Sequence, residues 1–288
     1  MTIKPILTVD ELHFRYPGRQ SDTIQDLSFE VSPGEIFGFL GPNGAGKSTT
    51  QKILIGLLQG YRGEVSLLGT NLGAWDRSLF NRIGVSFELP NLYGRLTALE
   101  NLQLFASFYT VPTADPFNLL ESLDLQNDAN RRVESFSKGM KMRLNVCRAL
   151  LPQPQLLFLD EPTSGLDPVN ARRMKDFIQQ KQESGTTIFL TTHNMDVAAE
   201  LCDRVAFLAE GKIAAIGAPQ DFMLRGGTGT LKVEITMDGR LLRKEFPLEK
   251  LAENEEFHAF LKRGIVRRIH SHEATLEDVF LQVTGKKL

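Results

Sequence analysis

The chain has 288 residues, of which 42% are hydrophobic and 24% charged, and its formal net charge is −2 at pH 7. This length suffices for one large α/β domain, or one domain with an appendage, around a well-buried core. The near-neutral charge provides no overall attraction to DNA, RNA or anionic lipid, so no nucleic-acid partner is expected. The only cysteines, Cys147 and Cys202, lack metal-ligand spacing, which argues against a disulfide framework and favours a reducing cytoplasm.

The first ten residues contain no apolar region of the kind found in signal peptides. The most apolar stretches, at 35–40 and 156–159, are far shorter than the ~20 residues that a bilayer span needs. We therefore expect a protein that does not cross a membrane by itself.

Up to about residue 217, apolar runs of strand length alternate with helical patterns and Gly/Pro turns. Nearly continuous apolar runs suit central strands that are covered on both faces. Helical patterns follow several of them, as at Thr49–Leu58 and Asn170–Gln182. The alternation predicts a largely parallel sheet flanked by helices. The expected strands are Ile36–Leu40, Leu156–Leu159, Thr187–Leu190 and Val205–Leu208.

Residues 89–151 interrupt this alternation. Their pattern is mostly helical, with turn signals at Pro90, Pro112 and Pro116. We interpret them as a helical insertion.

After residues 226–227 the pattern changes again, to that of a small α+β unit. Two strands, Leu231–Thr236 and Leu241–Phe246, flank Asp238 and Gly239, which favour a type I′ turn. A helix at about 248–262, a strand at 265–271 and a helix at 275–283 are expected to follow. The spacing of Thr275 and Asp278 predicts a capping box at the last helix.

The strongest motif lies directly after the expected strand Ile36–Leu40. Residues 41–48 fit the phosphate-loop pattern G-x-x-x-x-G-K-[ST]. Glycines let the backbone wrap a phosphate and turn N–H groups inward at a helix N-terminus, where anions are favoured. Lys47 is expected to reach the β- and γ-phosphates of ATP, and the Ser48 hydroxyl to bind Mg²⁺. The predicted nucleotide-binding residues of the loop are Gly41, Pro42, Asn43, Gly44, Ala45, Gly46, Lys47, Ser48 and Thr49.

Two acidic residues follow the expected strand Leu156–Leu159. A carboxylate there lies at the C-terminal edge of the sheet, where ligands bind in open α/β sheets. We expect Asp160 to hold the metal and Glu161 to take a proton from the attacking water as general base. The alternative, an acidic pair without a catalytic role, is disfavoured by the phosphate loop upstream.

Further motifs, in order along the chain, resemble those of ABC ATPases. Residues 135–143 resemble the signature motif, residues 160–167 the Walker B motif and D-loop, and residues 191–193 the segment of the switch histidine. Tyr16 matches the A-loop aromatic residue that stacks on adenine, and Glu88 stands where the Q-loop glutamine is expected. The resemblance covers about residues 7–217. An unrelated phosphate-loop kinase or GTPase would lack the signature motif.

The resemblance implies that two such domains pair head to tail and bury two ATP molecules. Ser137 and Gly139 would contact the γ-phosphate held on the phosphate loop of the other subunit, and Asp167 would also lie at the nucleotide. His193 would sense the γ-phosphate beside Glu161 and act with it in catalysis. The implied fold is a phosphate-loop (RecA-like) core with antiparallel β and helical subdomains in residues 1–222. Residues 223–288 would form a small α+β accessory domain.

Three positions in the signature and one in the Q-loop depart from the common family pattern. Phe136, Lys138 and Met140 replace the usual Leu, Gly and Gln, and Glu88 replaces the Q-loop glutamine. These forms, with the ending 275–285, resemble the exporter-type (ABC-2) branch. Glu88 is expected to act as a further metal ligand beside Asp160; the alternative is that it points away and serves only the fold of its loop.

We therefore expect a cytoplasmic ATPase, peripheral on the inner face of the cell membrane, that powers export through a separate transmembrane permease. Its substrate would be drug-like, antibiotic-like or a lipid, and it would act as a homodimer or with a second ABC ATPase subunit. Leu92, Tyr93 and Leu96 would contact the permease or, equally, belong to the core of the helical subdomain. In the alternative interpretation, Tyr16 is an aromatic residue of a turn and has no nucleotide role. A soluble ABC ATPase in translation or DNA repair, and an importer motor, are the alternative functions.

Overall fold

The computed structural model describes residues 4–226, 230–237, 240–271 and 274–285. Contacts divide the chain into two compact units, residues 1–218 and residues 219–287. The second unit starts with helix α7 (Pro219–Gly226), so the boundary expected after residue 222 falls inside that helix.

A six-stranded sheet in the order β10-β9-β3-β8-β7-β6 forms the centre of the first unit. Every neighbouring pair is parallel except β10, which pairs antiparallel with β9. β3, β7 and β8 are buried along their whole length, as expected of central strands covered on both faces. The largely parallel sheet is thus confirmed. Its strands are β3 (Ile36–Leu40), β6 (Ile83–Ser86), β7 (Leu156–Asp160), β8 (Thr187–Thr192), β9 (Arg204–Ala209) and β10 (Lys212–Gly217).

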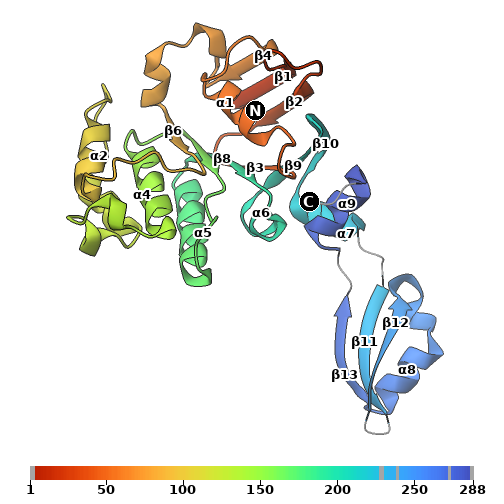
Figure 1. The fold of residues 1–288 in the computed structure, drawn as a ribbon. Coiled ribbons are helices and arrows are strands. Elements are labelled where there is room, and N and C mark those ends of the chain that lie inside the picture. Colours follow the sequence, from red (N-terminus) through yellow and green to blue (C-terminus); the bar gives the residue numbers. More distant parts are fainter. Residues whose placement is uncertain (1–3, 227–229, 238–239, 272–273, 286–288) are drawn as a thin grey trace. The chain divides into compact units, whose positions relative to one another are not determined.

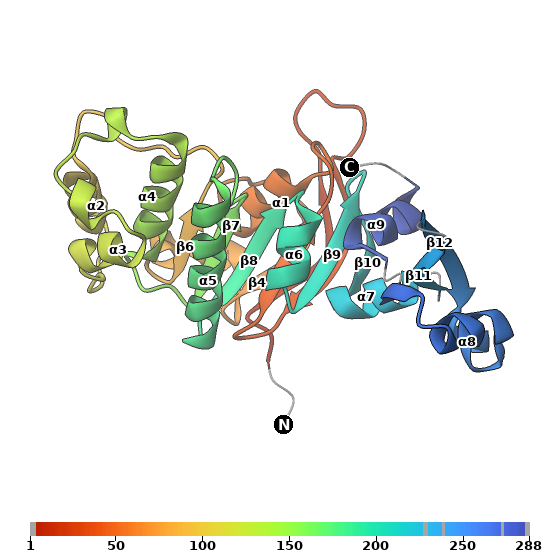
Figure 2. The same ribbon diagram turned by 90° about the horizontal axis from the view of Figure 1, so that it is seen from below.

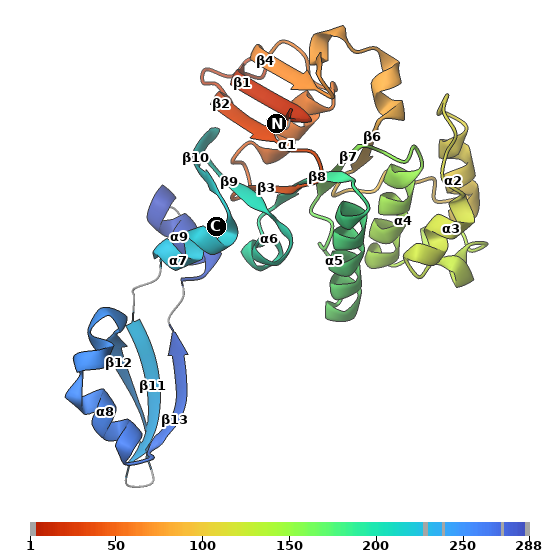
Figure 3. The same ribbon diagram turned by 180° about the vertical axis from the view of Figure 1, so that it is seen from behind.

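Helices cover both faces of this sheet (Figures 1 and 3). α1 (Lys47–Leu54) lies on one face; α4 (Lys138–Leu150), α5 (Pro168–Glu183) and α6 (Met195–Leu201) lie on the other. The prediction that α1 runs to Leu58 is wrong: α1 ends at Leu54, and Gly56 has a φ of 75°, typical of the residue that ends a helix. Across the described part of the chain, no helix has the length and apolar character needed to cross a membrane.

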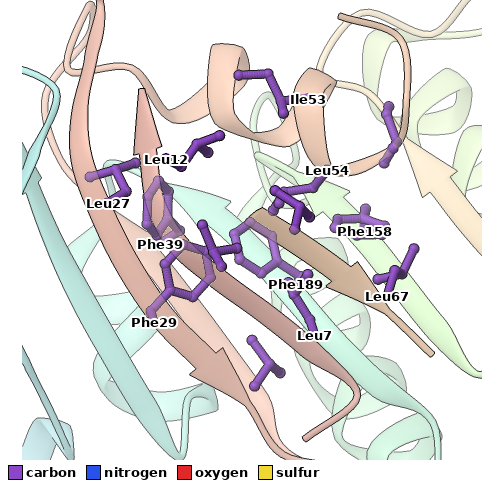
Figure 4. Close-up of a cluster of buried hydrophobic side chains, with 14 of the residues drawn as sticks. Leu7, Leu12, Leu27, Phe29, Phe39, Ile53, Leu54, Leu67, Phe158 and Phe189 are labelled. Atoms are coloured by element: carbon purple, nitrogen blue, oxygen red, sulfur yellow. The ribbon is translucent and has the colours of Figure 1, made fainter. Parts of the chain in front are cut away.

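A second, antiparallel sheet packs over α1 and the central strands. Its order is β2-β1-β4-β5. The inner side chains of both sheets and α1 form one buried core, in which Phe29 lies among Phe39 and Phe189 (Figure 4). This packed core supports the loop between β3 and α1. The strands are β1 (Leu7–Phe14), β2 (Ile24–Val31), β4 (Arg62–Leu67) and β5 (Thr70–Asn71).

The expected helical insertion lies at the β6 end of the sheet (Figure 2). α2 begins with a capping box, in which Thr97 and Glu100 each accept a hydrogen bond from the other's backbone N–H. Two short 3₁₀ helices, η1 (Leu72–Ala74) and η2 (Arg77–Asn81), precede β6. The insertion comprises α2 (Ala98–Ala106), α3 (Pro116–Ser122), η3 (Gln126–Asp128), η4 (Val133–Ser135) and α4.

The second unit contains the expected strands and last helix, but one prediction in it is wrong. The helix expected at 248–262 is split into η5 (Leu248–Glu253) and α8 (Glu255–Lys262), because Asn254 caps α8 by accepting a hydrogen bond from Phe257 N. The capping box of Thr275 and Asp278 is confirmed. The predicted Asp238–Gly239 turn lies outside the described residues. The other elements are β11 (Thr230–Met237), β12 (Arg240–Pro247), β13 (Val266–Ser271) and α9 (Leu276–Thr284).

Candidate nucleotide and metal site

The phosphate loop connects the C-terminal end of β3 to the start of α1, and its two defining glycines are required by geometry. A Cβ at Gly41 would lie 2.2 Å from the backbone oxygen of Leu208. Gly46, the N-cap of α1, has a φ of 113°, which L side chains rarely adopt, and a Cβ there would lie 2.7 Å from Ile24 Cδ1. The loop therefore ends at a helix N-terminus whose free N–H groups favour an anion.

The remaining loop residues differ in exposure. Asn43, Gly44 and Ser48 are exposed, whereas Pro42 and Thr49 are half-buried and Ala45 is buried. Ala45 anchors the loop, because its backbone oxygen accepts a hydrogen bond from Gly211 N at 3.0 Å. The exposed members are free to meet a ligand.

Lys47 is folded back into the loop. Its Nζ donates hydrogen bonds to the backbone oxygens of Gly41 at 2.6 Å and Pro42 at 3.2 Å, and only 7% of the residue is exposed. Burial lowers the pKa of Lys47, opposed by the carboxylates of Glu161, Asp160 and Glu88. The phosphate loop and all three acidic residues predicted for the site are therefore within electrostatic reach of one ammonium group.

Asp160 ends β7 at the edge of the sheet where the phosphate loop lies. Only 7% of the residue is exposed, and its carboxylate accepts a hydrogen bond from the Thr191 hydroxyl of β8. Burial raises the pKa of Asp160, and the neighbouring charges of Glu161 and Glu88 raise it further. A cation at this position would relieve both penalties.

Glu161 is oriented by three hydrogen bonds from Thr192, the last residue of β8, and His193, the residue that follows it. Its Oε2 accepts from the Thr192 hydroxyl at 2.8 Å, and its Oε1 accepts from His193 N at 2.8 Å and lies 2.6 Å from His193 Nδ1. The carboxylate is buried, whereas the His193 side chain is 53% exposed. The two residues predicted as catalytic are thus in direct contact, with the imidazole toward solvent.

Glu88 follows β6 and is exposed. Its charge raises the pKa of Asp160, while its backbone N–H lowers that pKa through a hydrogen bond. Among the residues described, no group of three or more His, Cys, Asp or Glu side chains could hold a metal ion. Hydroxyl and carboxylate oxygens such as those of Ser48 and Asp160 nevertheless fit Mg²⁺, which proteins bind through one or two carboxylates together with substrate phosphates.

Tyr16 lies over the start of α1. Its hydroxyl is 3.3 Å from Thr49 Oγ1, and its ring packs edge-on against Phe14 with centroids 4.9 Å apart. The structure therefore brings Tyr16 to the phosphate loop, although it also packs against the buried core.

The signature segment contacts the D-loop. Ser137 caps α4 by accepting a hydrogen bond from Met140 N at 3.2 Å. Lys138 packs against Gly165, where a Cβ would lie 2.6 Å from Lys138 Cδ, and Gly139 packs against Leu166. No hydrogen bond among the described residues joins this segment to the phosphate loop.

Asp167, also predicted at the nucleotide, caps α5. Its carboxylate accepts hydrogen bonds from Val169 N at 3.1 Å and Asn170 N at 3.0 Å. Hydrogen bonds from Asn170 lower the pKa of Asp167. Asp167 and the signature residues are therefore positioned by helix caps at the ends of neighbouring helices.

Sequence reasoning missed the polar residues that support the site. Thr191 and Thr192 orient Asp160 and Glu161, and they directly precede His193, for which alone a role was predicted in that segment. Asn145, on α4, binds the residues just before Glu88. Two adjacent threonines at a strand end could have indicated the first pair; nothing local in the sequence indicates Asn145.

A parallel sheet with a glycine-rich loop before a helix, a buried lysine and an adjacent acidic pair defines a phosphate-loop NTPase. The additional signature and D-loop segments define an ATPase of the ABC type.

The comparisons with known proteins agree. Residues 24–164 match the ABC transporter family, and residues 230–273 match the C-terminal domain of fluoroquinolone efflux ABC transporters. The chain is 49% identical over 284 residues to the fluoroquinolones export ATP-binding protein of Mycobacterium tuberculosis, covering 98% of this chain and 94% of the relative. It is 38% identical over 308 residues to the Nod factor export ATP-binding protein I of Burkholderia pseudomallei, covering 100% and 99%.

Solved structures show the same fold. An ATP-binding subunit of an ABC transporter has a TM-score of 0.69 at 31% identity, covering 76% of this chain and 92% of that one. A dimeric ATP-binding cassette bound to ADP and Pi after hydrolysis has a TM-score of 0.67 at 25% identity, covering 74% and 98%. The chain belongs to the family of ABC transporter ATP-binding proteins, in its exporter-type branch, and it is an ATPase.

Proposed function

We propose that this chain hydrolyses Mg²⁺-bound ATP between two paired subunits and thereby drives export through a separate membrane permease. The observation that carries the catalytic part is the buried Glu161 carboxylate, held by Thr192 and His193 beside Asp160 and Lys47. This arrangement provides a general base, a metal ligand and a phosphate-binding cation at one edge of the sheet.

Each group has a distinct role in this proposal. Lys47 leaves the carbonyls of Gly41 and Pro42 to bind the β- and γ-phosphates. Ser48, Asp160 and Glu88 would hold Mg²⁺, which would neutralise charge that develops on the phosphates. Glu161 accepts the proton of the attacking water, and His193, with its ring toward solvent, contacts the γ-phosphate.

The positions of Ser137 and Gly139 support the pairing of two subunits. Their segment makes no hydrogen bond to the phosphate loop of its own chain among the described residues, so a second subunit would have to present it to ATP. The solved relative with ADP and Pi is dimeric, which supports this assembly. Either a homodimer or a pair with a second ABC ATPase would present a signature segment to the ATP of the other subunit.

In this proposal a permease docks beside Glu88 and holds the chain at the cytoplasmic face of the membrane. Leu89 is 74% exposed and Tyr93 is 52% exposed, so apolar surface is accessible directly after the metal site. Nearby, Phe80, Phe105 and Phe108 line a hollow of about 690 Å³. Exposed aromatic residues around a concavity favour a protein partner.

The proposed substrates are drug-like or antibiotic-like molecules, with a lipid-like molecule as the second class. The near-complete coverage of the relative named for fluoroquinolone export, together with the C-terminal match, supports the first class. The relative named for Nod factor export supports the second.

Nucleotide binding is tested by Lys47→Ala. The substitution removes the only side-chain cation of the phosphate loop, so affinity for MgATP should fall by at least about tenfold, since hydrogen bonds to charged groups are worth ~1.5–3 kcal/mol. Isothermal titration calorimetry measures this loss, with Lys52→Ala on the same helix as control. Wild-type affinity in the Lys47 variant would refute the site.

Export is tested by the accumulation of a fluorescent fluoroquinolone in cells that lack this chain. Accumulation should rise on deletion and return to normal with the wild-type chain but not with Glu161→Gln. Equal accumulation in all strains would exclude fluoroquinolones as substrates, and the same design with a labelled lipid would then test the second class.

A further inference from the structure

Asn145 lies in α4, the helix that begins with the signature segment, and it is completely buried. Its Nδ2 donates hydrogen bonds to Ser86 Oγ at 2.9 Å and to the backbone oxygen of Phe87 at 2.7 Å. Ser86 is the last residue of β6, and Phe87 lies between it and Glu88. One side chain of α4 therefore holds the last residues before the proposed metal ligand.

The amide has an energetic cost that an apolar residue would avoid. Asn145 Oδ1 is buried without a hydrogen-bond partner, and an unpaired buried acceptor destabilises the fold. Exchanging Oδ1 and Nδ2 would place an acceptor against the Phe87 carbonyl oxygen, so the contacts fix which end donates. The benefit of an amide at this position must then lie in the two bonds that its NH₂ group donates.

α4 also holds the chain on the other side of Glu88. Arg148, one turn further along α4, donates a hydrogen bond to the backbone oxygen of Asn91 at 2.9 Å. Before Glu88, β6 touches α4 directly, because a Cβ on Gly84 would lie 2.1 Å from the Ala149 backbone oxygen. Glu88 thus sits in a short segment fixed to α4 at both ends.

The opposite end of α4 carries Ser137, which caps the helix, and Lys138, which packs on the D-loop residues Ser164 and Gly165. A helix is a rigid connection, and rigid elements pass a displacement from one end to the other. A shift of the signature segment would therefore move the loop that holds Glu88 relative to Asp160.

We propose that Asn145 is a positioning residue of the metal site, which fixes Glu88 to the signature helix and so makes metal binding depend on the position of α4. This inference rests on the proposed function, because it takes Glu88 to act on Mg²⁺. Asn145 itself touches neither metal nor nucleotide; it acts through Ser86 and Phe87.

The test replaces Asn145 with Leu, which has a similar volume and no donor. The Mg²⁺ concentration for half-maximal ATPase rate should rise about tenfold, as is typical when a group that orients a metal ligand is lost. The Mn²⁺ electron paramagnetic resonance spectrum of the complex with a non-hydrolysable ATP analogue should shift toward that of Glu88→Ala. Ser86→Ala removes one of the two acceptors and should produce a smaller change in the same direction.

Cys147→Ala is the matched control. Cys147 is also buried in α4, but its Sγ lies 3.2 Å from the backbone oxygen of Leu119, toward α3. This variant should lose stability without a change in Mg²⁺ requirement or Mn²⁺ spectrum. If it shifts both as much as Asn145→Leu does, a general loosening of α4 explains the effect and the inference is wrong.

The Glu88→Ala variant, measured alone and combined with Asn145→Leu, distinguishes a failure of this inference from a failure of the proposed function. There, Asn145→Leu should produce no additional shift, because the group it positions is gone. If Glu88→Ala itself changes neither readout, the metal role of Glu88 fails and the inference fails with it. If Glu88→Ala changes both readouts but Asn145→Leu and Ser86→Ala change neither, only the inference about Asn145 is refuted. Should Asn145→Leu not fold, Ser86→Ala decides by the same criteria.

Discussion

Glu161 combines a strained backbone with a fully engaged carboxylate. Its φ is 50°, in the left-handed region that costs a non-glycine residue about 1–3 kcal/mol. The backbone is held there because Glu161 N donates a hydrogen bond to Thr191 O at 2.9 Å. The two carboxylate oxygens accept hydrogen bonds from Thr192 and His193. The carboxylate is thereby held against His193, an orientation that suits the proposed role of Glu161 as general base.

Asp160 is expected to destabilise the metal-free protein. Burial, Glu161 and Glu88 raise its pKa, so the folded state disfavours the ionised form. The unfavourable contribution is absent at low pH, grows as pH rises above the ordinary aspartate pKa of about 3.9, and is complete above the raised pKa. Asp160→Asn, which can still accept from Thr191, should therefore be the more stable protein at pH 7 in the presence of a chelator.

Urea unfolding of both proteins at several pH values measures this difference. The advantage of Asp160→Asn should shrink as pH falls toward the ordinary aspartate range, and it should reverse when Mg²⁺ and ATP are added. A difference in the free energy of unfolding that is constant with pH would contradict this account of Asp160.

Glu88→Gln should need about tenfold more Mg²⁺ for half-maximal ATPase rate, since it removes a negative charge that acts on Asp160 and Lys47. ATP hydrolysis at saturating Mg²⁺ should be retained. The assay titrates Mg²⁺ at fixed ATP, with Glu64→Gln, an exposed carboxylate on β4, as control. Superimposable curves for wild type and Glu88→Gln would remove Glu88 from the metal environment.

The residues proposed to bind nucleotide and metal were predictable because each lies in a contiguous motif. Lys47, Asp160 and Glu161 follow from local spacing at a strand end, and the structure gathers them. Asn145 was not predictable, because its partner Ser86 lies 59 positions away and only the packing of α4 on β6 brings the two together. Motifs reveal the groups that do chemistry, whereas the groups that hold them depend on tertiary contacts.

At the scale of elements, the buried strands and the helix caps carried the strongest signals. β3, β7 and β8 each contain a short, nearly continuous apolar run, and the capping box at Thr275 depends on two residues close in sequence. The helix predicted at 248–262 was wrong because its apolar pattern continues across Asn254, which instead ends η5 and caps α8. Asn254 followed by Glu255 and Glu256 is itself a helix-start signal, so the error came from giving periodicity more weight than capping.

The contact between β6 and α4 leads to a prediction for Gly84. A Cβ at this position would lie 2.1 Å from the Ala149 backbone oxygen and 2.9 Å from Leu157 Cδ1, and backbone cannot give way as a flexible side chain can. Gly84→Ala should therefore lower the free energy of unfolding by about 1–3 kcal/mol.

Gly94→Ala is the matched control for Gly84→Ala. The three heavy atoms nearest to its Cβ would all belong to Glu134, with the side-chain Cβ nearest at 3.5 Å, an ordinary van der Waals contact, so stability should hardly change. Chemical denaturation of the two variants compares them directly. Equal free energies of unfolding would mean that α4 and β6 are not held as closely as the structure has them.

At the scale of the whole molecule, the two units differ in which hydrophobic core each of them buries. The first unit buries one core between its two sheets and α1, whereas the sheet and α8 of the second unit bury a separate cluster around Val233, Phe246 and Phe257. The change of pattern after residue 226 indicated the second unit. It did not indicate that α7 groups with that unit, because α7 contacts α9, far along the chain.

The last prediction concerns the assembly. Glu161→Gln should form a dimer that depends on ATP and persists, because the substitution removes proton acceptance while it preserves the site. The Gln oxygen can still accept from His193 N, and its NH₂ group can donate to the Thr192 hydroxyl, which serves as donor or acceptor. Hydrolysis should slow by about 10²–10⁴-fold, the usual contribution of a general base. With ATP intact, the γ-phosphate continues to link Lys47 of one subunit to Ser137 of the other.

Size-exclusion chromatography with multi-angle light scattering tests this assembly. The variant should have twice the chain mass with Mg²⁺ and ATP, and the single chain mass with ADP or without nucleotide. Wild type should be monomeric in all three conditions, because it consumes the ATP that bridges the subunits. The double variant Lys47→Ala with Glu161→Gln should also stay monomeric, since ATP then has no lysine to hold it at the interface. A dimer that forms without nucleotide would show that pairing does not depend on the γ-phosphate, and hydrolysis at the wild-type rate would remove Glu161 from the role of general base.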